Sequence, residues 1–181
     1  MTEKDEIIEK IGETEATLLE IPAEKFNRTQ RELIEDLSKE NEKIIIISVT
    51  RPGKNILKEM EEKDISTDSI VVLDTVTKTQ KKDTEDTENI HYIDNPSSLT
   101  QIPIAIDKEM KKGGTVIIVD SINSLLIHND EKILKKFVHG ILTKTRINDL
   151  PTVLLATEGQ LSKDMRADIA QLCDKTFSLE S

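Results

Sequence analysis

Aromatic residues and cysteine are scarce in this sequence. Its 181 residues include no tryptophan, one tyrosine and three phenylalanines, so the core must be built mainly from Ile, Leu and Val. The single cysteine, Cys173, excludes an intrachain disulfide and suits a reducing compartment. Because Cys173 lies in an amphipathic segment, we expect it to be a core residue rather than a nucleophile.

Long hydrophobic runs and an excess of basic charge are also missing. No apolar run approaches the roughly 20 residues of a membrane span, and the acidic N-terminus is unlike a secretory signal. The 35 acidic and 25 basic residues give a net charge of −10, which repels nucleic-acid phosphates. We therefore expect a cytoplasmic protein with neither a membrane nor a nucleic acid as partner.

Short apolar runs alternate with amphipathic segments along the whole chain. The pattern predicts strands at 17–21, 43–49, 69–73, 90–93, 116–120, 151–156 and 175–179. It predicts helices at 4–12, 29–41, 96–112, 130–147 and 160–172, and one more after the turn at 51–53. This alternation indicates an α/β fold, a mostly parallel sheet between two layers of helices. No linker or repeat divides the chain, so we expect one domain over 1–181, with an N-terminal helix within 1–14.

Residues 75–89 interrupt this pattern, because they are almost entirely polar and charged. Such a segment buries too little apolar surface to offset the entropy lost on ordering. We expect a mobile surface loop here, and interpret it as a solvated connector rather than a functional loop.

One apolar run ends on a carboxylate. The turn Gly113-Gly114 leads into Val116–Val119, and Asp120 and Ser121 follow directly. A strand buried on both faces has this pattern, and open α/β sheets bind ligands at the carboxyl ends of their strands. In P-loop nucleotide hydrolases an aspartate at this place holds the magnesium of the nucleotide. Asp120 is thus either a vestigial metal position or a turn-forming residue at a strand end.

The segment 22–29 stands where a P-loop would stand, between the first strand and its helix, and it has the P-loop length. Pro22 replaces the first glycine and has no N–H to offer a phosphate. Asn27 replaces the second glycine, Arg28 replaces the lysine, and Thr29 keeps the hydroxyl. Glu24 adds a negative charge where phosphates would lie.

The same segment also has the pattern of an ordinary helix start. Asn27 or Thr29 could cap a helix, and Thr29 with Glu32 fits a capping box. We favour the helix start over a phosphate cradle. The candidate nucleotide-binding residues, vestigial or weakly binding ATP and magnesium, are Lys25, Asn27, Arg28, Thr29, Asp120 and Ser121.

From Thr17 to Leu179 the chain resembles a divergent RecA-like ATPase domain of the KaiC-like kind found in archaea and bacteria. Val116–Leu126 is similar to the Walker B strand and the Asp-Ser that follows it. The second strand and helix of that family are similar to Ile44–Val49 with the polar turn after it, Asn55–Met60 and Ile65–Asp68. Pro151–Glu158 and Ile169–Phe177 resemble its late strand and its tail. The resemblance implies a three-layer RecA-like fold.

The sequence departs from that family where catalysis would occur. Active members have acidic catalytic residues just after the second strand, whereas Ser48–Lys54 contains no carboxylate. They also continue into hairpins beyond the last strand, where this sequence reaches Ser181. His91, His128 and His139 have no metal-ligand spacing, so we assign no metal site and no catalytic residue.

These departures favour a pseudo-ATPase with a degenerate Walker A segment over an enzyme. The expected function is regulatory or signalling, through contact with a protein partner or through self-association, with no cofactor. The alternative is a nucleotide-binding sensor that has a distorted P-loop and hydrolyses little or no ATP.

Overall fold

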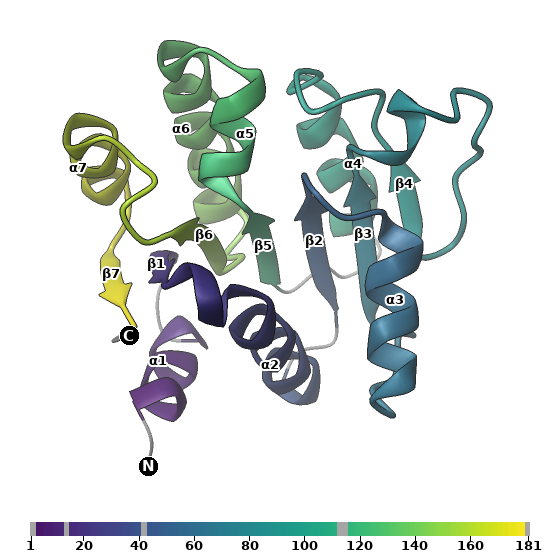
Figure 1. Cartoon of the computed structure of the whole chain (residues 1–181), viewed down its shortest axis with the longest axis horizontal. Helices are drawn as coiled ribbons and strands as arrows, with labels where there is room; N and C mark the ends of the chain where they lie inside the picture. The colour runs from purple at the N-terminus through teal and green to yellow at the C-terminus, as the bar shows by residue number, and fades with distance from the viewer. Residues whose placement is uncertain (1–2, 13–14, 41–42, 112–115, 180–181) are drawn as a thin grey trace.

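A parallel sheet forms the centre of the molecule (Figure 1). The computed structural model describes residues 3–12, 15–40, 43–111 and 116–179, and within them the sheet has seven strands in the order β4-β3-β2-β5-β6-β1-β7. Every neighbouring pair of strands is parallel. The strands are β1 (Ala16–Ile21), β2 (Ile44–Ser48), β3 (Ile70–Asp74), β4 (Ile90–Tyr92), β5 (Val116–Asp120), β6 (Thr152–Thr157) and β7 (Lys175–Ser178).

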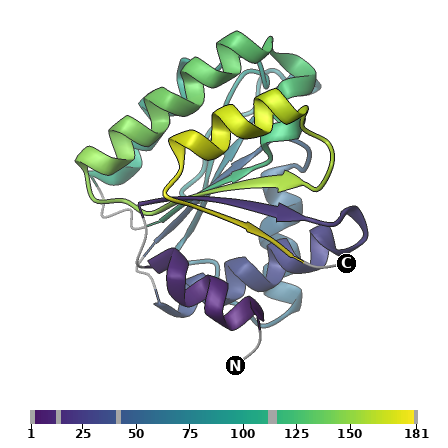
Figure 2. The same cartoon turned by 90° about the vertical axis from the view of Figure 1, so that its left-hand side faces the viewer.

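Helices cover both faces of the sheet (Figure 2). They are α1 (Glu3–Gly12), α2 (Phe26–Glu40), α3 (Gly53–Glu62), α4 (Gln101–Met110), α5 (Ile122–His128), α6 (Glu131–Ile147) and α7 (Lys163–Leu172), with 3₁₀ turns η1 (Ala23–Lys25) and η2 (Thr77–Thr79). Apolar residues of α1, α2 and α3 pack on one face, and those of α4 to α7 on the other. None of these helices is long and apolar enough to span a membrane.

The strand sequences are apolar throughout because both faces of the sheet are covered. In β2, Ile45 and Ile47 belong to the core under α4 to α7, and Ile44 and Ile46 to the core under α2 and α3. All four isoleucines are 0% exposed. A strand covered on both faces has no position for a polar side chain except near its ends. The predicted single-domain, three-layer α/β fold is confirmed.

Several helices differ from those expected; α7, for example, begins at Lys163 instead of residue 160. Helix α2 begins at Phe26, so Thr29 lies inside its first turns and the predicted capping box is wrong. Its start is set by η1, in which Lys25 N–H donates to the carbonyl of Pro22. Helix α4 begins at Gln101, because Asn95 holds the preceding residues in turns. Helix α5 was not expected; it begins after Ser121, whose hydroxyl accepts from Ser124 N–H.

The segment 75–89 is tied to the sheet at both ends. Asp74 accepts hydrogen bonds from the backbone N–H groups of Val76, Thr77 and Gly53 at 2.8 Å each. Near the other end, the carboxylate of Asp86 accepts from Tyr92 N–H at 2.8 Å. The mobility expected of the residues between these anchors stays a prediction.

An ion pair between a buried glutamate and a half-exposed arginine joins the last two elements to β1. Glu20, 5% exposed on β1, accepts three hydrogen bonds of 2.6–3.0 Å from Arg166 of α7. Its carboxylate also accepts from the hydroxyl of Ser178 in β7 at 3.1 Å. This carboxylate therefore links β1, β7 and α7.

We expect Arg166→Met to lower the free energy of unfolding by about 2 kcal/mol, because Glu20 is then left buried without its counter-charge. Urea unfolding followed by circular dichroism measures this loss. The double variant Glu20→Leu/Arg166→Met is the control, and it should lose clearly less than the single variant. Equal losses in the two variants would contradict this account.

Candidate functional site

The candidate site lies at the carboxyl edge of the sheet, where the arrowheads of β2, β3 and β5 end in Figure 1. Asp120 is the last residue of β5 and is 4% exposed. It lies in register with Ser48, the last residue of β2, and with Leu155 of β6. Both faces of β5 are covered and accept only apolar side chains, so a carboxylate fits only at the end of the strand.

A glutamine from α2 occupies one oxygen of this carboxylate. The side-chain amide of Gln30 donates a hydrogen bond to Oδ2 of Asp120. Gln30 is itself 1% exposed, and its Oε1 accepts from Nη1 of Arg51 at 3.2 Å. The buried carboxylate is therefore satisfied from within the chain, by a neutral donor that a cation holds in place.

Arg51 continues this chain of contacts to α3. Its Nη2 binds the carboxylate of Glu59, which also accepts from Nη1 of Arg31 at 3.0 Å. Burial by itself raises the pKa of Glu59, but hydrogen bonds from the two guanidinium groups outweigh it and lower the pKa. Glu59 is therefore an ionised anchor that fixes both arginines.

Burial has the opposite outcome at Asp120. Loss of water contact raises the pKa of Asp120 to about 6, against the opposing effects of the Arg51 charge and the Gln30 hydrogen bond. A neutral amide and a cation bound elsewhere compensate a buried carboxylate less than a direct ion pair would. Ionised Asp120 therefore costs the folded state free energy.

The segment 22–29 forms a helical turn. Pro22 is followed at once by η1, and η1 runs directly into α2. Among the described residues, a positive φ occurs at Asp64, Asp149 and Gly159, and at none of residues 22–29. Phosphate-binding loops depend on positive-φ positions to aim several backbone N–H groups at one anion. The side chain of Phe26 packs against the core on the α2 side of the sheet.

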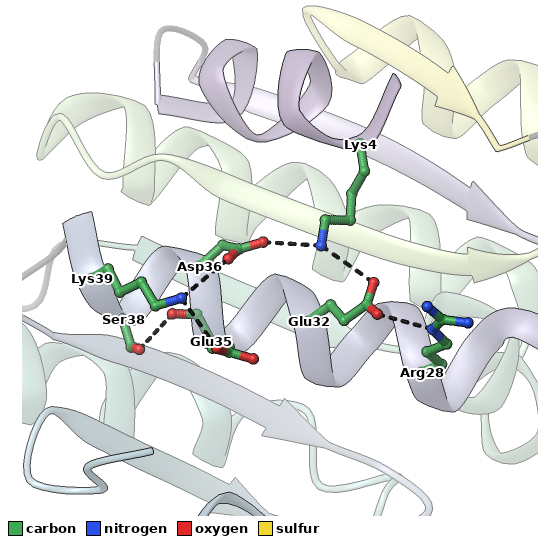
Figure 3. A network of polar contacts seen from close by, with 7 residues as sticks. All are labelled: Lys4, Arg28, Glu32, Glu35, Asp36, Ser38 and Lys39. Atoms are coloured by element: carbon green, nitrogen blue, oxygen red, sulfur yellow. Dashed lines mark hydrogen bonds and ion pairs between the residues drawn. The ribbon is translucent and has the colours of Figure 1, made fainter. Parts of the chain in front are cut away.

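Arg28, the expected counterpart of the P-loop lysine, lies along the surface of α2. Its Nε donates to Glu32 at 2.9 Å, and its side chain is 77% exposed. Glu32 also binds Nζ of Lys4 in α1 at 3.3 Å, and Lys4 reaches Asp36 at 3.2 Å (Figure 3). The hydrogen bond from Arg28 is the main cause that lowers the pKa of Glu32. Arg28 thus belongs to a network that joins α1 to α2.

The structure places the six predicted site residues in different surroundings. Lys25, Asn27 and Arg28 are exposed, whereas Thr29 is buried within α2. Asp120 binds Gln30, and Ser121 caps α5. Sequence analysis missed the two residues that engage Asp120, Gln30 and Arg51.

A signal for both residues was available. Gln30 directly follows Thr29, and Arg51 lies in the turn after β2, the same turn that lacks a carboxylate. Gln30 lies near the start of α2, and Arg51 lies just after the end of β2. Both places are at the carboxyl edge of the sheet.

Other candidates for chemistry are not supported. Burial raises the pKa of the Cys173 thiol to about 11, so it stays protonated at neutral pH and is a poor nucleophile. His91 contacts the carboxylates of Asp86 and Glu109 at 3.1 and 2.5 Å. Across the described ranges, no group of three or more His, Cys, Asp or Glu side chains could hold a metal ion.

Comparison with known proteins shows the family and the fold. The model of a family of unknown function (DUF7504) matches residues 20–179, so the chain belongs to that family. No curated protein matches.

Among solved structures, the chain is similar to the KaiC-like protein PH0186 from the archaeon Pyrococcus horikoshii OT3. The TM-score is 0.58 at 15% identity, over 91% of this chain and 71% of that one. It is also similar to the ATPase domain of a second solved protein, with a TM-score of 0.59 at 11% identity, over 92% of this chain and 69% of that one. The fold is therefore RecA/KaiC-like, as the resemblance implied.

We expect Asp120→Asn to stabilise the protein in a pH-dependent way. The pKa rises from 3.8 to about 6 on folding, so ionising Asp120 costs the native state about 3 kcal/mol. Below pH 4, Asp120 is protonated in both the folded and the unfolded protein, and the cost of ionising it is absent. It develops between about pH 4 and pH 6 and is complete above pH 6.

The free energies of unfolding of the variant and the wild type, measured by urea denaturation from pH 3.5 to pH 8, test this expectation. Their difference should grow by about 3 kcal/mol in favour of Asp120→Asn across that interval. Asp83→Asn, at an exposed residue of the segment 75–89, serves as the control. A difference that does not change with pH would show that Asp120 ionises without cost.

Proposed function

We propose that this member of the DUF7504 family is a non-catalytic RecA/KaiC-like module that acts by binding protein. The observation that carries the proposal is the occupied carboxylate of Asp120. In P-loop hydrolases the corresponding carboxylate is reserved for magnesium. Here the amide of Gln30 donates to it, and Arg51 holds that amide.

The form of residues 22–29 supports the same proposal. A cradle for a triphosphate needs backbone N–H groups that converge on the phosphates. In this chain the segment is a 3₁₀ turn continued by a helix, and the N–H of Lys25 already donates to Pro22. Opening a cradle would require refolding the start of α2, at the cost of the Phe26 contacts with the core.

The absence of a positioned general base is a third argument. Hydrolysis needs a residue that orients the attacking water. The turn after β2 carries Thr50 and Arg51 instead of a carboxylate, and the nearby Glu59 is engaged by Arg31 and Arg51. A carboxylate that is bound by two guanidinium groups is a weak base and is not free to accept a proton from water.

A nucleotide sensor is the second candidate, and the exposure of Arg28 favours it. The Arg28 side chain is held by one surface ion pair, which contributes little to stability. A rotation of that side chain would offer a guanidinium to a phosphate near the start of α2. Binding without turnover would require Asp120 to exchange Gln30 for magnesium.

The partner proposed is a protein, either another chain or a second copy. The net charge of −10 disfavours nucleic acid. A regulatory role in the cytoplasm, as the sequence suggested, remains part of the proposal.

Isothermal titration with ATP, in the presence and absence of magnesium, separates the two candidates. The non-catalytic module should show no saturable binding up to about 1 mM ATP, a free-energy gain below about 4 kcal/mol. Saturable, magnesium-dependent binding that is lost in both Arg28→Ala and Asp120→Ala would establish the sensor instead. Lys39→Ala, at the far end of the same helix, is the matched control and should leave any binding unchanged.

A further inference from the structure

Two residues of the segment 75–89 cover the edge of strand β4. This strand ends the sheet and, among the described strands, pairs only with β3 (Figure 1). The N–H of Ile90 donates to the hydroxyl of Thr87 at 3.1 Å, and its carbonyl accepts from the N–H of Thr87 at 2.9 Å. The N–H of Tyr92 donates to Asp86 at 2.8 Å. An uncovered strand edge would offer such groups to another chain.

His91 links this cover to the interior of the protein. Its Nδ1 lies 3.1 Å from Oδ2 of Asp86, and its Nε2 lies 2.5 Å from Oε1 of Glu109 in α4. The side chain of Glu109 is 1% exposed, and its other oxygen accepts from Nζ of Lys43 at 2.8 Å. The side chain of Asp86 is 49% exposed. The imidazole ring therefore bridges a buried carboxylate and a surface carboxylate.

This geometry requires a proton on each ring nitrogen of His91. Burial raises the pKa of Asp86, but the hydrogen bonds from Tyr92 N–H and His91 outweigh it and lower the pKa below its usual value. The ammonium group of Lys43 favours the ionised form of Glu109 in the same way. An ionised carboxylate can only accept hydrogen bonds, and only the imidazolium form of histidine donates from both nitrogens.

Loss of one proton would leave one of the two contacts unsatisfied. A neutral imidazole has one N–H and one acceptor nitrogen, and the acceptor would face a carboxylate oxygen. Glu109 is buried against Lys43, whereas Asp86 can turn toward water. A cleft of about 180 Å³ beside the ring, lined also by Gln101 and Lys108 of α4, leaves space for that movement. The contact with Asp86 is therefore the one that breaks.

We infer that His91 is a proton-operated latch for the segment 75–89. Its imidazolium form holds Asp86 against β4, and the neutral form releases Asp86 and uncovers the N–H of Tyr92. The latch is closed at acidic pH and opens as the pH rises. It goes beyond the proposed function and does not rest on it, because β3 and β2 separate β4 from β5, the strand of Asp120.

The charged groups around the latch come from several elements. Asp86 faces the ring from the segment 75–89, and Glu109 and Lys108 face it from α4. Lys43 acts through Glu109 from the start of β2. Lys78 acts through Asp86 and also lies 3.8 Å from Asp94. Of these side-chain types, only histidine ordinarily changes its charge between about pH 5 and pH 8.

Amide hydrogen exchange of the full chain, followed by NMR at pH 5.5 and pH 8.5, tests the latch. Each rate is divided by the intrinsic rate at that pH, so that the ratio reports local opening. The protection of Tyr92 N–H should fall at least tenfold at pH 8.5. The N–H groups of Val76 and Thr77 are the internal reference and should keep their protection, because Asp74 holds them. The ¹⁵N shifts of the His91 ring report its protonation in the same samples.

Two histidine variants identify the titrating group. His91→Gln removes the titration, so the protection of Tyr92 N–H should be equal at the two pH values. His139→Gln, at an exposed histidine of α6, is the matched control and should keep the fall seen in the wild type.

Asp86→Asn distinguishes the latch from an ordinary ion pair. The amide oxygen of asparagine can still accept from Tyr92 N–H, and its NH₂ group then faces Nδ1 of His91. Nδ1 is an acceptor in the neutral ring that donates from Nε2 to Glu109. At pH 8.5 this variant should therefore protect Tyr92 N–H at least fivefold better than the wild type.

An ordinary ion pair would be weakened by Asp86→Asn at both pH values. Equal protection of Tyr92 N–H in the wild type at pH 5.5 and pH 8.5 would overturn the inference. A fall that persists in His91→Gln, or an Asp86→Asn variant less protected than the wild type at pH 8.5, would do the same. Saturable ATP binding would refute the proposed function and leave these results unaffected.

Discussion

Coverage of the sheet on both faces is the constraint on which the rest of this structure depends. Seven parallel strands lie between two layers of helices, and β2 alone buries four consecutive isoleucines completely. A parallel sheet of this kind excludes polar side chains from the middle of its strands. Polar side chains are therefore concentrated toward the strand ends, and the carboxyl edge collects Ser48, Asp74 and Asp120.

The two aspartates at that edge illustrate two ways to satisfy a buried carboxylate. Asp74 accepts three backbone N–H groups and one hydroxyl, and so fixes the start of α3 and of the following loop. Asp120 receives a glutamine amide that is backed by an arginine, and burial raises its pKa. Because the Gln30 amide already binds the Asp120 carboxylate, that carboxylate is not free for magnesium, and this contact is the physical basis of the proposed loss of nucleotide chemistry.

The fold could be read from the sequence to a large extent, because hydrophobic periodicity is a local property. The runs at Ile44–Ile47 and Val116–Val119 indicated strands covered on both faces, and the structure has them at those places. The start of α2 was wrong by three residues, because Pro22 nucleates a 3₁₀ turn that competes with the capping pattern at Thr29. Helix α5 escaped notice because seven residues are too few to display a helical period.

The sequence by itself determined the fold class, the place of Asp120 at a strand end and the poor match of residues 22–29 to a phosphate loop. These follow from residue order, since strand burial and backbone freedom are set by neighbouring residues. Only the tertiary structure decided what Asp120 binds. Gln30 and Arg51 lie 90 and 69 positions from it along the chain. Gln30 binds Asp120 and Arg51 binds Gln30 because α2 and the turn after β2 converge on the same edge of the sheet. Such contacts depend on the crossing of elements in space, which no local pattern encodes.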